Sequence, residues 1–198
     1  EEFDHRCQIY SEEKAKNPAT RYRIGKDLTA RIHCCLIPWE DLDDLPCLRF
    51  IHVRTNAASP LFAEGCTFGF PWVEGETMHV VTGASKTWGS DRLLFLRSDD
   101  LIHWEQYAEV HLPGWRIFNM NVAKKDGLYT LMVEIDAPVQ ECGVPFTFRF
   151  LQSEDGINWT LTPSECVFQK ERYAGSPALY AFEDDPYYYV GYLEAYPD

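Results

Sequence analysis

The sequence predicts an all-β protein, a β-propeller assembled from four-stranded antiparallel blades. Aromatic residues make up 15% of the 198 residues, and aromatic side chains favour the pleated, half-buried surface of a strand. The heptapeptide SDDLIHW at 98–104 returns as SEDGINW at 153–159. Strand-like segments flank both copies with similar spacing, and a repeat of about 45–55 residues is typical of propeller blades.

The repeated unit is longer than the heptapeptide. The first copy covers about residues 66–110 and the second about 117–163, each with four short aromatic or β-branched segments divided by Gly, Asp or Pro. EGE at 74–76 and KDG at 125–127 lie between the first and second segments of each copy, where a hairpin turn is expected. A third, shorter unit covers about residues 173–198. The sequence therefore predicts two full blades and part of another.

The heptapeptide itself has a structural explanation. Asp100 and Asp155 can accept backbone N–H groups in the turn between the third and fourth strands of each blade. Trp104 and Trp159 end the two copies and are placed to fill the gap between neighbouring blades. We expect a turn and an aromatic wedge in each blade, and no catalytic role for the motif.

The N-terminal region, about residues 1–58, is less regular. It contains two strand-like runs, ARIHCCLI and PCLRFIHV. A five-bladed ring needs about 250–300 residues at this repeat length. We therefore expect either that the chain is part of a longer propeller or that its N-terminal strands complete the last blade. A β-sandwich with two similar hairpins is the alternative fold.

Composition narrows the classes of partner and cofactor. The net charge of −13, from 31 acidic and 18 basic residues, argues against nucleic acid and is compatible with a neutral ligand. The sequence contains no run of about 18 apolar residues, the length that would suggest a membrane span. The seven cysteines include no C-x-x-C pair and the histidines have no metal-ligand spacing, so no metal or cofactor is predicted. Their irregular spacing suggests a reduced, cytoplasmic protein, although one disulfide remains open, and the oligomeric state is not indicated.

Carboxylates in apolar strands are the candidate catalytic groups. In LMVEID, Glu134 and Asp136 are two residues apart and point to the same side of a strand. Glu194 in VGYLEA falls within one residue of Glu134 when the repeats are aligned. Converging carboxyl groups suit glycoside hydrolysis, in which one acts as acid and the other as base or nucleophile. Strand capping by these side chains is the alternative.

Five further residues are candidate substrate contacts. Asn119 and Asn121 form a polar pair on the apolar strand FNMNV, where they could hold sugar hydroxyls or serve a turn or bulge. Arg149 interrupts the aromatic strand FTFRF and is expected to meet a carboxylate of a neighbouring strand. Trp88 could stack on a sugar ring, and Glu141 lies in a loop that could overhang the channel mouth.

These segments resemble the five-bladed propeller glycosidases of glycoside hydrolase families 43 and 32. The similarity rests on SDDLIHW and on GSPALYAFEDDPYYYVGYLEA, a proline-containing first strand followed by a Tyr-rich second strand. FNMNVAKKDGLYTLMVEID resembles more closely an uncharacterised bacterial group labelled glycosyl hydrolase-like. The resemblance covers about residues 66–198 and implies a five-bladed fold and an activity on sugars.

The catalytic residues of those families match less well than the fold. The first-blade Asp of family 43 has no counterpart, and Gly175 stands where a Glu precedes the proline. Glu141 and Cys142 are similar to the Glu-Cys acid site of family 32, but they lie in a predicted loop instead of a strand. Because function inferred from fold alone is analogy, the site must be argued from its own residues.

The sequence therefore predicts a glycoside hydrolase, or glycosidase-like protein, that acts on a neutral plant or microbial sugar. Glu134 is the first candidate for the catalytic carboxylate, with Asp136 and Glu194 as its partners. The alternative is a propeller that binds carbohydrate without cleaving it. A scaffold of the WD-repeat type is less well supported, since neither full repeat carries the Gly-His and Trp-Asp pairs.

Overall fold

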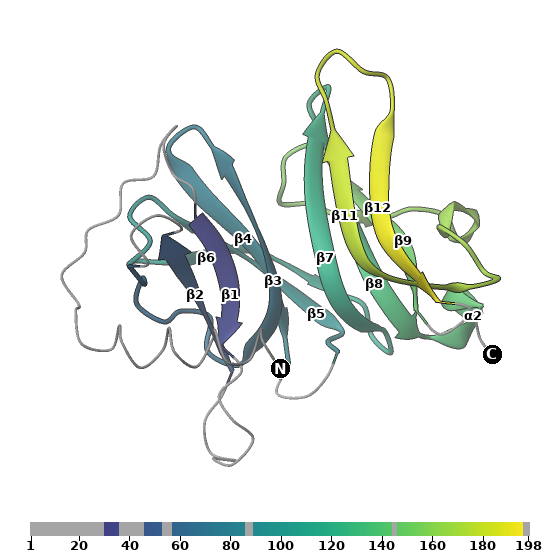
Figure 1. The fold of residues 1–198 in the computed structure, drawn as a ribbon, viewed down its shortest axis with the longest axis horizontal. Coiled ribbons are helices and arrows are strands. Elements are labelled where there is room, and N and C mark those ends of the chain that lie inside the picture. Colours follow the sequence, from purple (N-terminus) through teal and green to yellow (C-terminus); the bar gives the residue numbers. More distant parts are fainter. Residues whose placement is uncertain (1–29, 36–45, 53–56, 86–88, 144–145, 196–198) are drawn as a thin grey trace.

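The computed structural model describes residues 30–35, 46–52, 57–85, 89–143 and 146–195. Its strands form antiparallel sheets that lie side by side like a fan (Figure 1). The described helical segments are short and lie between strands. The predicted fold class, an all-β protein with four-stranded antiparallel sheets, is confirmed. None of the helices in these described residues is long and apolar enough to span a membrane.

Two sheets have four strands each, paired in chain order. Each starts with an inner strand and continues outward through hairpins and a turn, as expected for the two repeats. The first sheet comprises β3 (Cys66–Glu74), β4 (Thr77–Ala84), β5 (Arg92–Ser98) and β6 (Glu105–His111). The second comprises β7 (Arg116–Lys125), β8 (Leu128–Ala137), β9 (Thr147–Ser153) and β10 (Thr160–Leu161).

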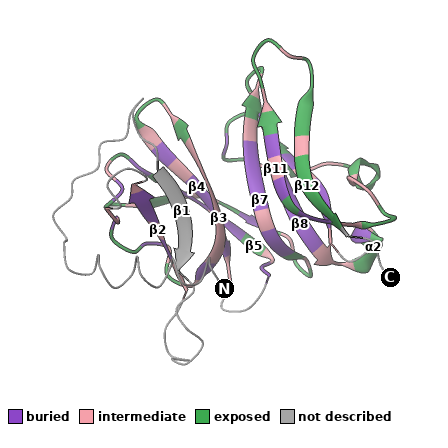
Figure 2. Cartoon of the chain, viewed as in Figure 1, coloured by how far each residue is buried: buried purple, intermediate pink, exposed green. Residues whose placement is uncertain are grey.

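Two smaller sheets flank this pair. At one end β1 (Ala30–Cys35) pairs with β2 (Cys47–His52), and bridges join β2 to Ala58 and Phe62. At the other end β11 (Tyr173–Ala181) pairs with β12 (Tyr188–Ala195). Figure 2 shows β12 as mainly exposed, whereas β7 and β8 are mainly buried. Two short helices, α2 (Val139–Cys142) and η1 (Ser164–Cys166), precede and follow the outer strands of the second sheet.

The inner strands β3, β7 and β11 contact one another in sequence along the inner edge of the fan. Each shifts its register with the next strand, at 67–69 in β3, at 117–120 in β7 and at 175–178 in β11, and β7 shifts a second time between Arg116 and Ile117. A bulge of this kind bends a strand and redirects its side chains. The three bulges lie on the segments that carry the candidate site.

The repeated heptapeptide forms the same turn in both sheets. Asp100 Oδ1 accepts the backbone N–H groups two and three residues later, both at 2.8 Å. Asp155 Oδ1 accepts the equivalent pair at 2.8 and 2.7 Å. The hydroxyls of Ser98 and Ser153 each accept the N–H three residues later, at 2.8 and 2.9 Å. The expectation that these aspartates organise the turn is confirmed.

The tryptophan that ends each heptapeptide packs against the preceding sheet. Trp104 of the first four-stranded sheet stacks on Phe62, with 4.0 Å between ring centroids. Trp159 of the second stacks on Phe95 of the first, with 5.0 Å between centroids. Burial of large aromatic surface contributes strongly to packing energy. The predicted wedge between blades is therefore confirmed at two consecutive junctions.

Candidate functional site

Glu134 is the buried carboxylate at the junction of the second sheet and β11. Its residue is 2% exposed, on β8 among buried apolar neighbours. One oxygen, Oε2, accepts hydrogen bonds from the side-chain amide of Asn119 and from the Asn119 backbone N–H at 3.3 Å. The other, Oε1, accepts the backbone N–H of Ser176 at 3.2 Å. A buried carboxylate needs such donors, since an unpaired one would be strongly destabilising.

The bulge in β7 brings Asn119 to this carboxylate. Ile117 pairs with Ile135 and Met120 with Val133, so two residues of β7 lie across from Glu134 alone. The extra residue turns the Asn119 backbone N–H and side-chain amide to the same oxygen. A regular strand would offer one of these two donors at most.

Tyr173 and Gly175 complete the surroundings of Glu134 on the β11 side. A Cβ atom added to Gly175 would lie 2.6 Å from the Tyr173 hydroxyl and 2.9 Å from Glu134 Oε1. Both oxygens therefore converge on the space that only glycine leaves open. Burial and the charge of Glu134 raise the pKa of Tyr173, so its hydroxyl keeps its proton at neutral pH and can donate it in a hydrogen bond.

Asp136 is held by an arginine that the sequence did not single out. Arg116, at the start of β7, donates from Nε and Nη2 to the two carboxylate oxygens at 2.6 and 2.5 Å. The Arg116 side chain is 55% exposed, whereas that of Asp136 is 10% exposed. The aliphatic part of the Arg116 side chain lies over Gly89, where an added Cβ would be 2.1 Å from Arg116 Cγ. The bidentate pair therefore presents a guanidinium to solvent at the same end of the strands as Glu134.

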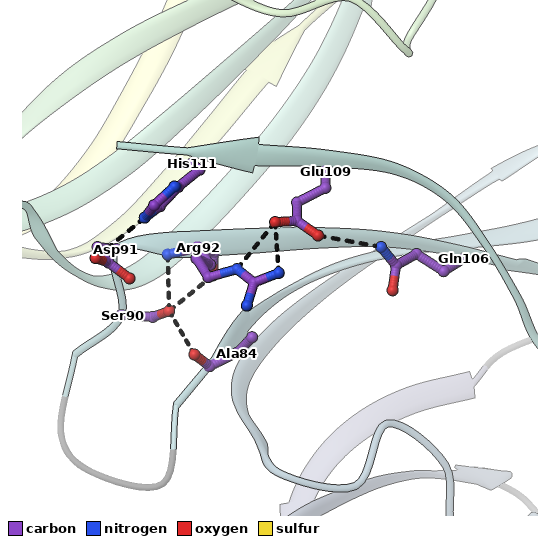
Figure 3. A network of polar contacts seen from close by, with 7 residues as sticks. All are labelled: Ala84, Ser90, Asp91, Arg92, Gln106, Glu109 and His111. Carbon is purple, nitrogen blue, oxygen red and sulfur yellow. Dashed lines mark hydrogen bonds and ion pairs between the residues drawn. The ribbon is translucent and has the colours of Figure 1, made fainter. Parts of the chain in front are cut away.

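The loop between β4 and β5 is fixed to the start of β7. Ser90 and Ile117 exchange two backbone hydrogen bonds of 2.8 Å. The Ser90 hydroxyl oxygen lies 2.9 Å from the carbonyl oxygen of Ala84 and 2.7 Å from that of Arg92, and its one proton is shared between these two acceptors. Figure 3 shows this network continuing through the Arg92 guanidinium to Glu109. These bonds hold Ser90, just before β5 of the first sheet, beside the start of β7 in the second.

Arg149, a predicted substrate contact, does not reach solvent. Its side chain is 1% exposed and donates to Glu141 on α2 and to the carbonyl of Thr162 at 2.7 Å. The guanidinium also lies 5.4 Å from the ring centroid of Trp115. The expected carboxylate partner exists, but it comes from α2 instead of a neighbouring strand. Through Arg149, β9 therefore contacts Glu141 on α2, Thr162 after β10 and Trp115 before β7. Direct sugar contacts were expected of Arg149 and Glu141.

Asn121 also has a structural role in place of the predicted substrate contact. It is 8% exposed. Its amide donates to the carbonyl of Pro177 at 2.9 Å, and its carbonyl accepts the N–H of Leu179 at 3.2 Å. Because every one of these bonds crosses from β7 to β11, Asn121 joins two inner strands, while Asn119, two residues earlier, serves Glu134.

Glu194 and Glu134 do not occupy equivalent positions: Glu134 lies across from the bulge of β7, but Glu194 does not lie across from the bulge of β11. Gly175 pairs with Leu193 and Ala178 with Gly191, so Tyr192 lies across from the bulge. Glu194 is two residues from that position and pairs with Arg172 at 3.1 Å. The alignment within one residue was therefore wrong, because a sequence alignment does not show where a strand bulges. Trp88, the predicted stacking residue, lies outside the described residues.

A row of aromatic rings that the sequence reasoning missed follows the inner strands. Phe68 and Phe118 have ring centroids 5.9 Å apart, Phe118 and Phe146 are 5.0 Å apart, and Phe146 and Tyr173 are 5.2 Å apart. Phe146 and Phe68 are partly exposed. In each inner strand the aromatic residue lies at or just before the bulge. An aromatic residue near the start of FGFP, FNMN and YAGSP is therefore the sequence feature that could have predicted this row.

In the part of the chain that the structure describes, no three His, Cys, Asp or Glu side chains are grouped as a metal site would require. The candidate site offers one buried carboxylate, one phenol, an ion pair and an aromatic row at one end of the inner strands.

Comparisons with known proteins extend the fold assignment. No protein-family profile matches this sequence. No curated protein matches it in a sequence search. The structure is similar to the GH32 beta-fructofuranosidase BmSUC1 of Bombyx mori, with a TM-score of 0.54 and 12% identity over 98% of this chain and 53% of that one. A mutant of the same enzyme in complex with sucrose gives a TM-score of 0.55 and 12% identity over 100% of this chain and 53% of that one.

At this identity the similarity shows the fold alone, a propeller fold. The chain spans about half the length of these structures, with 53% covered. Activity, substrate and partners are therefore matters for proposal.

Proposed function

We propose that this chain recognises a neutral carbohydrate at the end of the inner strands, in the site formed by Glu134, Asn119, Tyr173 and the pair of Arg116 with Asp136. The observation that carries the proposal is the Glu134 carboxylate, 2% exposed and held by donors from two inner strands. A buried carboxylate costs stability unless it is satisfied, and such groups are often retained for function. The propeller fold, shared with a glycosidase solved with sucrose, supports the same ligand class.

The groups around Glu134 suit the hydroxyls of a sugar. The protonated Tyr173 phenol can donate a hydrogen bond to a sugar hydroxyl, and the exposed Arg116 guanidinium offers further donors. Asp136 supplies carboxylate oxygens beside that guanidinium, so the pair is close to neutral overall. Partly exposed Phe146 offers an apolar ring face next to Tyr173. An anionic ligand would meet a chain with a net charge of −13.

Recognition is favoured over hydrolysis by the way the other carboxylates are occupied. Asp136 gives both oxygens to Arg116, Glu141 binds Arg149, and Glu194 binds Arg172. Glycoside hydrolysis needs two carboxyl groups facing the sugar, about 5–10 Å apart, one of which carries a transferable proton. Both oxygens of Asp136 already accept hydrogen bonds from the Arg116 guanidinium.

Hydrolysis is the second candidate, favoured by the Tyr173 hydroxyl and Glu134 Oε1 meeting at Gly175. In this version Glu134 would be the catalytic carboxylate, with Asp136 or Glu194 as a partner that first has to leave its arginine. The substrate would be a glycoside of a neutral sugar.

One set of measurements separates the two candidates. Binding of sucrose, fructose and glucose is measured by calorimetry, and reducing-sugar release from sucrose is measured in parallel. Recognition alone predicts saturable binding without turnover, weakened about tenfold or more by Glu134→Gln because one Oε acceptor becomes a donor facing N–H groups. The exposed turn variant Glu183→Gln serves as the matched control. Turnover that Glu134→Gln abolishes would establish hydrolysis, and no effect of Glu134→Gln on binding would exclude this site.

A further inference from the structure

A polar pocket of about 320 Å³ opens at the opposite end of the first four-stranded sheet from the Glu134 site. It lies where β4 begins, where β5 ends and where β6 begins, beside the first heptapeptide turn. Glu134 lies near the end of β8, beside the β7 start that the β4–β5 loop contacts. The pocket is lined by Thr77, His79, Arg97, Ser98, Asp99, His103 and Glu105.

The lining groups are held in place by one another. Thr77 donates to Asp99 Oδ1 at 2.6 Å. Arg97 donates to Glu105 Oε2 from Nε at 2.9 Å, and its Nη2 lies 2.8 Å from the same oxygen. His79 stacks on the ring of Trp72, with 5.1 Å between centroids. These contacts link the lining groups at the surface, where the side chains of Arg97 and Glu105 are 46% and 63% exposed.

The second repeat shows that the fold does not require this set of side chains. Register pairs Met78 with Ser98 and Tyr129 with Ser153, so Thr130 is the counterpart of His79. Between the third and fourth strands, Arg97 pairs with Glu105 in the first sheet, and Gln152 pairs with Thr160 at the same place in the second sheet.

The serine–aspartate turn nevertheless forms the same hydrogen bonds in both sheets. The turn therefore works without a histidine, an arginine or a glutamate at these places. Outside the turn, His79 stacks on Trp72 and Arg97 lies 5.5 Å from the ring centroid of Tyr107, while both also line the pocket.

We propose that this pocket binds a small neutral polyol, of monosaccharide size, independently of the Glu134 site. Its volume, about 320 Å³, is at the lower end of the range of about 300–1,000 Å³ for small-molecule sites, so it accommodates one small ligand. Guanidinium, carboxylate, hydroxyl and imidazole groups together offer both donors and acceptors, as vicinal hydroxyls require.

The charge of the lining disfavours an anionic ligand. Asp99 and Glu105 are both acidic, and Arg97, the basic residue of the lining, is already paired with Glu105. Burial lowers the pKa of His79, so the imidazole is neutral at pH 7. Its Nδ1 lies 3.2 Å from the Tyr107 hydroxyl, which leaves Nε2 for a ligand hydroxyl.

The test is an NMR titration of the chain with glucose, fructose and myo-inositol, each up to about 100 mM, with an expected Kd of about 1–10 mM. The proposal predicts saturable shifts of the His79 and His103 ring protons and of the Thr77 amide with at least one probe. The triple variant His79→Thr, Arg97→Gln and Glu105→Thr carries the residues of the second repeat. It should keep the wild-type fold and lose the shifts.

A control variant distinguishes binding at this pocket from binding at the Glu134 site. Glu134→Gln should leave the pocket shifts unchanged, whatever it does to binding near Ser176. Absence of saturable shifts at the pocket with all three probes would overturn the proposal, as would shifts that persist in the triple variant. Stronger shifts with acetate or phosphate than with the polyols would overturn the assignment of a neutral ligand.

Discussion

The carboxylate of Glu134 accepts the backbone N–H of Ser176 at 3.2 Å, and this bond joins β8 of one sheet to β11 of the next. With the donors from Asn119 it places a buried acid across the junction of two inner strands. The same atoms that tie the two sheets together thus form the base of the candidate site. Changes at Glu134 should therefore affect both stability and ligand recognition.

Replacing Glu134 by Leu should lower the free energy of unfolding by about 2–5 kcal/mol, because three N–H donors lose their acceptor in a buried place. Glu134→Gln keeps one acceptor oxygen and should cost about 1–2 kcal/mol. Urea denaturation followed by tryptophan fluorescence measures both. A Leu variant as stable as wild type would contradict the role of the carboxylate in joining the sheets.

Gly175→Ala should destabilise the protein by about 1–3 kcal/mol, because its methyl group overlaps two oxygens of the site. The added carbon would lie 2.6 Å from the Tyr173 hydroxyl and 2.9 Å from Glu134 Oε1. Gly191→Ala on the paired strand is the control, since its nearest contact would be an ordinary 3.7 Å. Thermal denaturation of the two variants should differ clearly, and equal midpoints would count against the crowding described here.

Gly89→Ala should displace the Arg116 side chain from Asp136. Gly89 has φ of +79° and its added Cβ would lie 2.1 Å from Arg116 Cγ. Gly114, with φ of +83° and no atom within 4 Å of the added carbon, carries the same backbone strain without the overlap. The NMR signal of the Arg116 Nε–H should shift in Gly89→Ala and stay in place in Gly114→Ala. A shift of similar size in both variants would assign the effect to the backbone alone.

Stability should decrease at acidic pH through the two heptapeptide turns. Backbone N–H groups, foremost those of His103 and Asn158, lower the pKa of Asp100 and Asp155 below the ordinary value of 3.8. Because the folded-state pKa lies below the unfolded one, this stabilisation is complete above about pH 5 and is lost as pH falls below about 4. Urea midpoints at about pH 7 and pH 3 should therefore differ less in an Asp100→Asn, Asp155→Asn double variant than in wild type. An unchanged difference would contradict the assignment.

The sequence predicted the parts of the fold that depend on local pattern. Asp100 acts within a few residues of the turn, so its role follows from turn chemistry, and the role of Trp104 follows from its repeated place at the end of the motif and the need to fill the space between sheets. The repeat then made the same roles visible at Asp155 and Trp159. Such features need no knowledge of distant contacts.

The site was harder to predict because bulges decide it. Asn119 and Asn121 look equivalent in FNMNV, yet the register shift sends one to Glu134 and the other to Pro177. Arg149 appeared to be a ligand contact because an arginine in an apolar strand is conspicuous, but its partner Glu141 lies on a helix whose position the sequence does not show. Long-range pairing of this kind is set by tertiary structure and is not visible in periodicity.

The most direct test of the central claim is an amide NMR titration of the chain with sucrose, glucose and fructose. Recognition at the Glu134 site predicts saturable shifts of the Ser176 and Asn119 amides and of the Asn119 side-chain NH₂, and the loss of these shifts in Glu134→Gln. Saturable binding that leaves these groups unaffected, or no binding by any of the three sugars, would contradict the proposal that the Glu134 site recognises a neutral carbohydrate.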